Sequence, residues 1–171
     1  MDSRLKNKLS RVKLLVSDFD GVMTDGYVYM DKSGRESVRC SRKDGLGVEL
    51  LKNSGVEVIV LSKENNPVVR ARCRKLKIEC RQGIASGAGK VSILKEILKA
   101  KNLDRSASCY IGDDINDAAA IKYAAVGVAV ADSHLLVKKA ADYITKAPGG
   151  RHAVRELAEL ILESQGVGLK I

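Results

Sequence analysis

Asp18-Phe-Asp-Gly-Val-Met-Thr-Asp-Gly26 is the stretch that decides the fold of this 171-residue chain. It follows residues 12–17, a short apolar run that is typical of a buried strand. Side chains two residues apart on an extended backbone point to the same side, so Asp18 and Asp20 are expected to face one pocket. Open α/β sheets bind ligands at this carboxyl end of their strands. A carboxylate nucleophile beside a carboxylate that transfers protons suits phosphoryl transfer. Taken alone, the motif fits a strand followed by an acidic turn equally well.

Strand patterns and helix patterns alternate along the rest of the chain. Apolar runs predict further strands at 56–61, 78–80, 107–111, 126–130 and 143–144. Helices are predicted over 46–53, from Pro67 to about Leu76, over 90–98, and in a last segment where Val154, Leu157, Ala158 and Ile161 recur at helical spacing. This alternation predicts an α/β fold with a mostly parallel sheet and helices on both faces.

A β-hairpin is predicted over about 27–40, because two strand-like segments flank a turn at 31–35. About forty residues separate Asp20 from Ser62, and fewer than about thirty separate Ser62 from Lys90. A folded lid needs about 50 residues or more, so neither gap holds one. We therefore expect a single domain over 1–171 without a cap domain.

The composition argues against several classes of partner. The net charge is +9, but the basic residues are spread along the helices, and one Phe, five Tyr and no Trp leave few platforms for stacking bases. We expect no nucleic-acid partner, and a basic surface that attracts anionic substrates. No apolar run approaches the ~20 residues that span a bilayer, and the polar N-terminus lacks a signal-peptide core. We therefore expect a cytoplasmic protein without membrane contact. The four cysteines lack CxxC spacing and are expected to be reduced thiols rather than zinc ligands.

Polar residues suited to phosphoryl transfer recur at later element ends. Ser62 follows the second predicted strand, Lys90 opens a helix, and Gly112-Asp-Asp-Ile-Asn-Asp117 follows another strand. A nucleotide P-loop ending at Lys90 is rejected, because the first Gly of GxxxxGK[ST] falls on Ile84 and Val91 replaces the Ser or Thr.

Together with residues 18–26, these motifs resemble the haloacid dehalogenase (HAD) superfamily of phosphatases, with its Rossmann-like fold. The resemblance runs from about Val12 to about Leu162. It is closer still to the small capless branch of 3-deoxy-manno-octulosonate-8-phosphate phosphatases and sialic-acid-type 9-phosphate phosphatases. Lys43-Asp-Gly-Leu-Gly47 and Gly149–Glu156 also carry it. Family members usually have a Thr-Gly-Arg or Ser-type turn where this chain has Ser62-Lys63-Glu64, so the usual Arg contact has no match here.

The resemblance implies catalytic and phosphate-binding roles. Asp18 is the expected nucleophile, and Asp20 is the expected acid that protonates the leaving group and then activates water. Ser62 and Lys90 are expected to bind the phosphate. An ordinary turn serine and an ordinary helix-start lysine are the alternatives for these last two.

A metal is expected as well, because several carboxylates and a phosphate dianion cannot share a pocket without a cation. Mg²⁺ is the expected cofactor. By resemblance its ligands are Asp18, the backbone carbonyl of Asp20, and Asp113, with Asp117 supporting them. Asp114 is the alternative to Asp113, and an acidic helix N-terminus is the alternative for the whole segment.

Three further residues are expected to face the substrate. Lys43 and Asp44 belong to a loop that the resemblance turns towards the sugar acid, although Asp44 could simply cap the following helix. Arg151 is a candidate for the substrate carboxylate, because Arg binds carboxylates through two parallel hydrogen bonds.

These roles predict a Mg²⁺-dependent phosphomonoesterase acting on a 2-keto-3-deoxy sugar acid, either an octulosonate 8-phosphate or a nonulosonate (sialic-acid-type) 9-phosphate. The resemblance also implies a homotetramer whose hairpins close neighbouring sites, with the tail Gln165–Ile171 as the alternative cover. The alternative function is a non-catalytic oligomerisation module associated with a sialic-acid cytidylyltransferase. Decay of that kind should remove a residue such as Asp18 or Lys90, and both remain.

Overall fold

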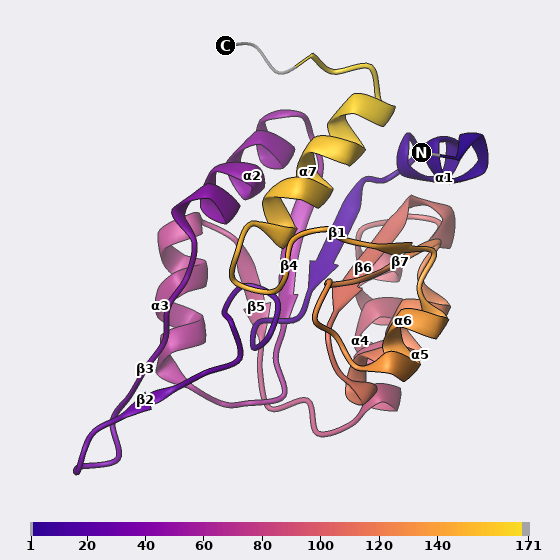
Figure 1. Cartoon of the computed structure of the whole chain (residues 1–171). Coiled ribbons are helices and arrows are strands. Elements are labelled where there is room, and N and C mark those ends of the chain that lie inside the picture. The colour runs from indigo at the N-terminus through magenta and orange to yellow at the C-terminus, as the bar shows by residue number, and fades with distance from the viewer. Residues whose placement is uncertain (1, 169–171) are drawn as a thin grey trace.

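One parallel sheet forms the centre of the computed structural model, which describes residues 2–168. In this part of the chain the sheet has six strands in the order β5-β4-β1-β6-β7-β8 (Figure 1). β1 lies between β4 and β6, so the strand that leads into the Asp18 motif is central. The strands are β1 (Leu14–Ser17), β4 (Glu57–Leu61), β5 (Glu79–Arg81), β6 (Ser108–Gly112), β7 (Val126–Ala129) and β8 (Tyr143–Ile144).

Helices cover both faces of the sheet. Leu15 of β1 belongs to a buried cluster with α1, α2, α3 and α7, whereas Leu14 and Val16 belong to a second cluster with α4, α5 and α6. This division follows from the two-residue period of a strand. The helices are α1 (Ser3–Leu9), α2 (Arg42–Asn53), α3 (Pro67–Leu76), α4 (Gly87–Ala100), α5 (Ala118–Tyr123), α6 (Leu135–Ala140) and α7 (Ala153–Ser164), with the short 3₁₀ helices η1 (Arg105–Ala107) and η2 (Ile115–Asp117).

The predicted hairpin is present and projects away from the sheet (Figure 1). Its strands, β2 (Tyr29–Met30) and β3 (Glu36–Ser37), are antiparallel and exposed, so regular pairing covers less than the predicted 27–40. Residues 2–168 form a single α/β domain without a cap, as predicted. Residues 1 and 169–171 lie outside the described part, so the predicted bounds of 1–171 stay a prediction.

Three helices and two helix starts differ from the prediction: α1, α5 and α6 were not predicted, and α4 begins at Gly87 rather than at Lys90. α1 is short and polar, and α6 has six residues, so neither has a clear apolar period. α2 begins at Arg42 rather than at the predicted Leu46, which was wrong. The Ser41 hydroxyl caps α2 by accepting the N–H groups of Lys43 (3.1 Å) and Asp44 (3.3 Å). The polar first turn of α2 hides its start from a reading of apolar spacing.

No helix within residues 2–168 is both long and apolar enough to cross a bilayer. All four cysteines are free thiols, and Cys73 and Cys109 are buried.

Candidate active site

Asp18 follows the last residue of β1, at the carboxyl edge of the sheet. Its N–H donates to the carbonyl of Ile111 in β6 at 3.0 Å, so β1 and β6 end side by side. Asp113 follows β6 at the same edge. Asp18 is 5% exposed, and Asp20 is half-buried. The parallel pairing therefore brings together two acidic motifs that are far apart in the sequence.

The loop after Asp18 is a compact turn. The Phe19 N–H donates to Asp18 Oδ1 at 2.6 Å. The Thr24 hydroxyl accepts the N–H groups of Gly21 (3.2 Å) and Gly26 (3.1 Å). Gly21 has φ +76°, a left-handed conformation that favours glycine. These bonds fix the path of the chain between the two carboxylates and the hairpin.

A glycine pair supports this loop from outside. The Gly150 N–H donates to the Val22 carbonyl at 2.9 Å. A Cβ on Gly149 would collide with the carbonyl of Gly21, and a Cβ on Gly150 would collide with the backbone of Thr24. The motif at Gly149–Glu156 therefore packs its glycines directly on the loop that carries Asp20.

Lys90 is enclosed between two carboxylates. Its Nζ lies 2.8 Å from Asp18 Oδ2 and 2.7 Å from Asp117 Oδ1, and its side chain is fully buried. Burial acts to lower the pKa of Lys90, but the charges of Asp18 and Asp117 outweigh it, so the pKa is raised. Burial and the Asp117 charge raise the pKa of Asp18, and Lys90 opposes them. The lysine therefore stays charged and favours the ionised form of Asp18.

Asp117 is saturated with hydrogen bonds. Its Oδ1 accepts from Lys90 Nζ and from the Tyr110 hydroxyl, both at 2.7 Å. Its Oδ2 accepts the N–H groups of Asp113 (3.2 Å) and Asp114 (3.4 Å). A carboxylate offers about four lone-pair sites, so four donors leave little room for a metal bond. Asp117 anchors the start of the loop after β6.

Asp113 keeps its carboxylate available. Within residues 2–168, no side chain or N–H of another residue donates to it, and it lies against Gly21, where a Cβ would collide with it. Carboxylate oxygens of Asp18, Asp113 and Asp117 lie within 4.8 Å of one another. Burial, followed by the charges of Asp117 and Asp114, raises the pKa of Asp113 to about 7. Crowded carboxylates with one lysine among them fit a hard divalent cation such as Mg²⁺, which prefers oxygen ligands.

A cavity of about 180 Å³ opens beside these carboxylates. Lys63, Glu64 and Asn116 line it, although the sequence did not single them out as site residues. Their signals were the departure of the Ser62-Lys63-Glu64 turn from the family pattern and the place of Asn116 in the motif after β6. Burial, followed by the charges of Glu64 and Glu36, raises the pKa of Asp20. A raised pKa suits a carboxyl group that donates a proton near neutrality. The cavity lining is Asp18, Asp20, Gly21, Gly26, Lys63, Glu64, Asp113, Asp114 and Asn116.

Ser62 lies at the same edge of the sheet, buried beneath its own loop. Its hydroxyl accepts the Glu64 N–H and donates to the Glu64 carbonyl, both at 3.2 Å. It is outside the cavity lining. The phosphate-binding role of Ser62 therefore stays a prediction.

The three expected substrate residues also lie outside the cavity lining. Lys43 and Arg151 are exposed, and their roles stay predictions. Asp44 is 3% exposed and accepts the N–H groups of His152 (3.3 Å) and Arg155 (2.8 Å). The expected alternative, a cap of α2 by Asp44, is wrong, because Ser41 caps α2. Asp44 instead holds the start of α7, and its substrate role stays a prediction.

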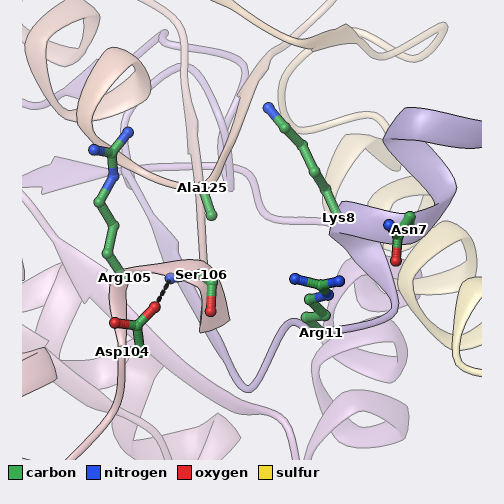
Figure 2. A pocket seen from close by; sticks show the side chains of 7 residues that line it. All are labelled: Asn7, Lys8, Arg11, Asp104, Arg105, Ser106 and Ala125. Atoms are coloured by element: carbon green, nitrogen blue, oxygen red, sulfur yellow. Dashed lines mark hydrogen bonds between the residues drawn. The ribbon is translucent and has the colours of Figure 1, made fainter.

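A second cavity, of about 400 Å³, lies at the opposite edge of the sheet (Figure 2). Arg11, Ser106 and Ala125 in its lining precede β1, β6 and β7 respectively. Figure 2 shows the Asp104 carboxylate accepting the Ser106 N–H (2.8 Å), with the Arg105 guanidinium pointing away from Asp104. Its lining contains neither Asp18 nor Lys90, so it is no part of the candidate active site.

Comparisons with known proteins bear on the family. Residues 61–154 match the haloacid dehalogenase-like hydrolase family. The 3-deoxy-D-manno-octulosonate 8-phosphate phosphatase KdsC of Haemophilus influenzae is 32% identical over 162 residues, which are 95% of this chain and 89% of that protein. KdsC of Escherichia coli K12 is 34% identical over 160 residues, which are 93% of this chain and 84% of that protein.

Solved structures agree with the sequence comparisons. A crystal structure of 3-deoxy-D-manno-octulosonate 8-phosphate phosphatase from Moraxella catarrhalis, in complex with a magnesium ion, a phosphate ion and KDO, has a TM-score of 0.92 and 32% identity. The match covers 97% of this chain and 94% of that chain.

Fold and site together define the class as a capless HAD-type phosphatase. Within that class, the chain belongs to the family of the 3-deoxy-D-manno-octulosonate 8-phosphate phosphatases. The predicted superfamily, fold class and enzyme class are thereby confirmed.

Proposed function

We propose that this chain is a Mg²⁺-dependent phosphomonoesterase that acts through an aspartyl-phosphate on a phosphorylated 2-keto-3-deoxy sugar acid. The observation that supports this most directly is the buried contact between Asp18 and Lys90, with Asp113 beside the same cavity. In phosphoryl transfer the protein acts mainly by positioning groups and by stabilising charge. The arrangement supplies the fixed carboxylate of Asp18, the fixed ammonium group of Lys90 and carboxylate oxygens that could bind a metal ion.

Asp18 is the nucleophile in this proposal. Its carboxylate attacks phosphorus, the new bond is Asp18 carboxylate oxygen to phosphorus, and the bond from phosphorus to the sugar oxygen breaks. Asp20 donates its proton to the departing sugar oxygen, which its raised pKa favours. In the second step Asp20 takes a proton from a water molecule that attacks the aspartyl-phosphate. Phosphate leaves, and Asp18 and Asp20 return to their starting states.

The metal would be held by Asp18, the backbone carbonyl of Asp20 and Asp113. When bound, Mg²⁺ neutralises the carboxylates and the phosphate dianion and helps to orient them. Asp113 is preferred over Asp114, because Asp114 is exposed and accepts the Ile115 N–H at 2.7 Å. Asp117 supports the site through Lys90 and the N–H groups of the loop. Lys90, with Ser62 beneath the Lys63–Glu64 turn, is the proposed phosphate-binding group.

The substrate proposed first is 3-deoxy-D-manno-octulosonate 8-phosphate. The relatives that cover nearly the whole chain carry this substrate in their names. A nonulosonate 9-phosphate is the second candidate. Lys63 and Glu64 line the cavity, and they occupy a turn that family members are expected to build from other residues, so the substrate beside this turn is expected to differ as well. The intact site counts against a non-catalytic module.

Assembly as a homotetramer is part of the proposal. Tyr27, Val28, Tyr29 and Met30 of the hairpin are 75%, 50%, 65% and 64% exposed, which is unfavourable for such apolar side chains unless a partner covers them. A second copy is the proposed partner, and neighbouring hairpins would restrict access to the cavity. The tail alternative, Gln165–Ile171, falls partly outside the described residues. We place the enzyme in the cytoplasm, with no nucleic-acid or membrane partner.

A direct test measures phosphate release from both sugar-acid phosphates and from an aryl phosphate, with Mg²⁺ and with EDTA. We expect a preference for one sugar-acid phosphate of at least about tenfold in kcat/KM over the aryl phosphate, and no turnover in EDTA. Asp18→Asn should fold and lack turnover, because an amide cannot form the acyl-phosphate. Full activity in EDTA, or turnover by Asp18→Asn, would overturn the mechanism.

A further inference from the structure

A buried tyrosine and Lys90 donate to the same carboxylate oxygen of Asp117. Tyr110 is fully buried on β6, and its hydroxyl donates to Asp117 Oδ1 at 2.7 Å. A buried tyrosine hydroxyl usually finds a partner, so the bond by itself is unremarkable. What gives it importance is that the same oxygen accepts Lys90 Nζ at 2.7 Å. Neither the sequence motifs nor the proposed function uses Tyr110.

The backbone of β6 explains why the two side chains meet. Tyr110 and Gly112 are two residues apart on the strand and therefore share a face. A Cβ on Gly112 would collide with the side chain of Asp117. The absence of a side chain at Gly112 lets Asp117 lie directly over the strand, within reach of the Tyr110 hydroxyl. Tyr110 also pairs in register with Val16 of β1, just before Asp18.

A continuous chain of short contacts results. Tyr110 donates to Asp117 (2.7 Å), Lys90 contacts Asp117 (2.7 Å), and Lys90 contacts Asp18 Oδ2 (2.8 Å). One ammonium group thus serves two carboxylates. Electrostatic interactions are strong in a buried site. How closely Lys90 approaches Asp18 or Asp117 therefore depends on the other hydrogen-bond donors of each carboxylate.

We propose that Tyr110 is a positioning residue for the reaction: its hydroxyl holds Asp117 in place and shares its negative charge, so that Lys90 remains available to Asp18 and to the phosphate. The proposal rests on the proposed nucleophilic role of Asp18. Without the hydroxyl, Lys90 is the one donor to Asp117 Oδ1 that remains among residues 2–168. Lys90 is then drawn towards Asp117 and away from the nucleophile.

The alternative is a purely structural bond, which only gives the buried Tyr110 hydroxyl a hydrogen-bond acceptor. Tyr143 offers a matched comparison. Its hydroxyl donates to Glu156 Oε1 at the same length, 2.7 Å, on β8 and outside the cavity lining. Tyr110→Phe and Tyr143→Phe therefore each remove one tyrosine–carboxylate hydrogen bond and almost no volume.

The experiment measures kcat and KM for an aryl phosphate at saturating Mg²⁺, together with Tm, for wild type and both variants. We expect Tyr110→Phe to lower kcat at least about tenfold with KM changed less than about threefold, because the bond orients a group that acts on the transferring phosphoryl group. Tyr143→Phe should lower Tm less, because Tyr143 and Glu156 are only half-buried, and should keep kcat near the wild-type value.

Each result decides the question. If Tyr110→Phe keeps the wild-type kcat, Tyr110 has a structural role only. The same conclusion follows if both variants lose kcat in proportion to their fall in Tm. If Tyr110→Phe fails to fold, Gly112→Ala, which displaces Asp117 from the strand, has to lower kcat in the same way. An inactive wild-type protein would instead overturn the proposed function, and that outcome is separate.

Discussion

Lys90 Nζ lies 2.8 Å from Asp18 Oδ2, fully buried, although the two residues come from the start of α4 and the end of β1. The same ammonium contacts Asp117 on its other side. This single cation therefore holds together the two acidic motifs at the carboxyl edge of the sheet.

Replacing Lys90 by Gln should remove both activity and stability. Two buried carboxylates would lose their counter-charge, and breaking a buried pair in this way costs about 3–5 kcal/mol of unfolding free energy. The deficit should shrink at lower pH, because burial already raises the pKa of Asp18 and protonation removes the unpaired charge. Urea denaturation at pH 5 and pH 7, with turnover measured alongside, checks this. Lys99→Gln, at an exposed position on the same helix, is the control; equal effects from both variants would contradict the prediction.

Asp113→Asn should weaken Mg²⁺ activation far more than Asp114→Asn. Both residues line the cavity, but within residues 2–168 no other residue donates to the Asp113 carboxylate, whereas Asp114 is exposed and accepts the Ile115 N–H. We expect the Mg²⁺ concentration for half-maximal activity to rise at least about tenfold in Asp113→Asn, because Mg²⁺ is bound by few protein oxygens. Titration of activity with Mg²⁺ gives this value directly. If Asp114→Asn shows the larger shift, the ligand assignment is reversed.

Stability without metal should fall as pH rises from about 4 to about 7. The pKa of Asp113 is raised to about 7 in the folded protein, against about 3.9 in an unfolded chain. Between these values the folded state binds more protons than the unfolded state, so the free energy of unfolding decreases with increasing pH.

Added Mg²⁺ should counter this fall, and its stabilising effect should be largest above about pH 7, where Asp113 is ionised. Thermal denaturation across this range, with EDTA or with Mg²⁺, measures both effects. Asp113→Asn should reduce the slope seen in EDTA. An unchanged slope in that variant would show that Asp113 is not its source.

Gly149→Ala should slow catalysis from outside the cavity. The new Cβ would collide with the carbonyl of Gly21 and push the loop that carries Asp20. A displacement of about 1 Å in a reacting group can cost about 10²-fold in rate, so we expect a loss of that order in kcat. Gly168→Ala is the control, because a Cβ there meets nothing within 4 Å. Wild-type kcat in Gly149→Ala would mean that the loop yields without moving Asp20.

Removing residues 28–39 should dissociate the proposed tetramer. The deletion takes away most of the exposed apolar residues of the hairpin and leaves Asp18, Lys90 and Asp113 on the sheet of each subunit. Light scattering should give the monomer mass. Turnover of an aryl phosphate should survive better than selectivity for the sugar-acid phosphate.

A milder variant guards against misfolding of the deletion. Tyr27→Ser combined with Tyr29→Ser keeps the hairpin backbone and removes its two most exposed aromatic side chains. It should weaken the assembly, so that the double variant dissociates at protein concentrations at which the wild-type protein is still tetrameric. A truncated or doubly substituted protein that stays tetrameric would place the interface elsewhere.

Much of the fold was predictable because its signals are local. The apolar run before Asp18, the alternation of strands with helices and the period of α7 each depend on neighbouring residues, and the structure has all of them. α1, α5, α6 and the starts of α2 and α4 were not predicted, because short or polar helical segments are stabilised by caps and by packing rather than by their own apolar period. Ser41 at the start of α2 is such a cap, and its effect is clear only once the backbone around it is known.

The sequence alone determined which residue types lie at the carboxyl edge of the sheet, because Asp18 and residues 113–117 directly follow predicted parallel strands and Lys90 lies at the start of a predicted helix. Only the tertiary structure decided how each carboxylate is used. Asp117 is occupied by Lys90 and by Tyr110, while Asp113 is left free. Asp44, which the resemblance turned towards the substrate, accepts two N–H groups at the start of α7, and its substrate role stays a prediction. The physical reason is that a carboxylate's role depends on which donors reach its oxygens, and those donors come from distant segments that meet only in the folded protein.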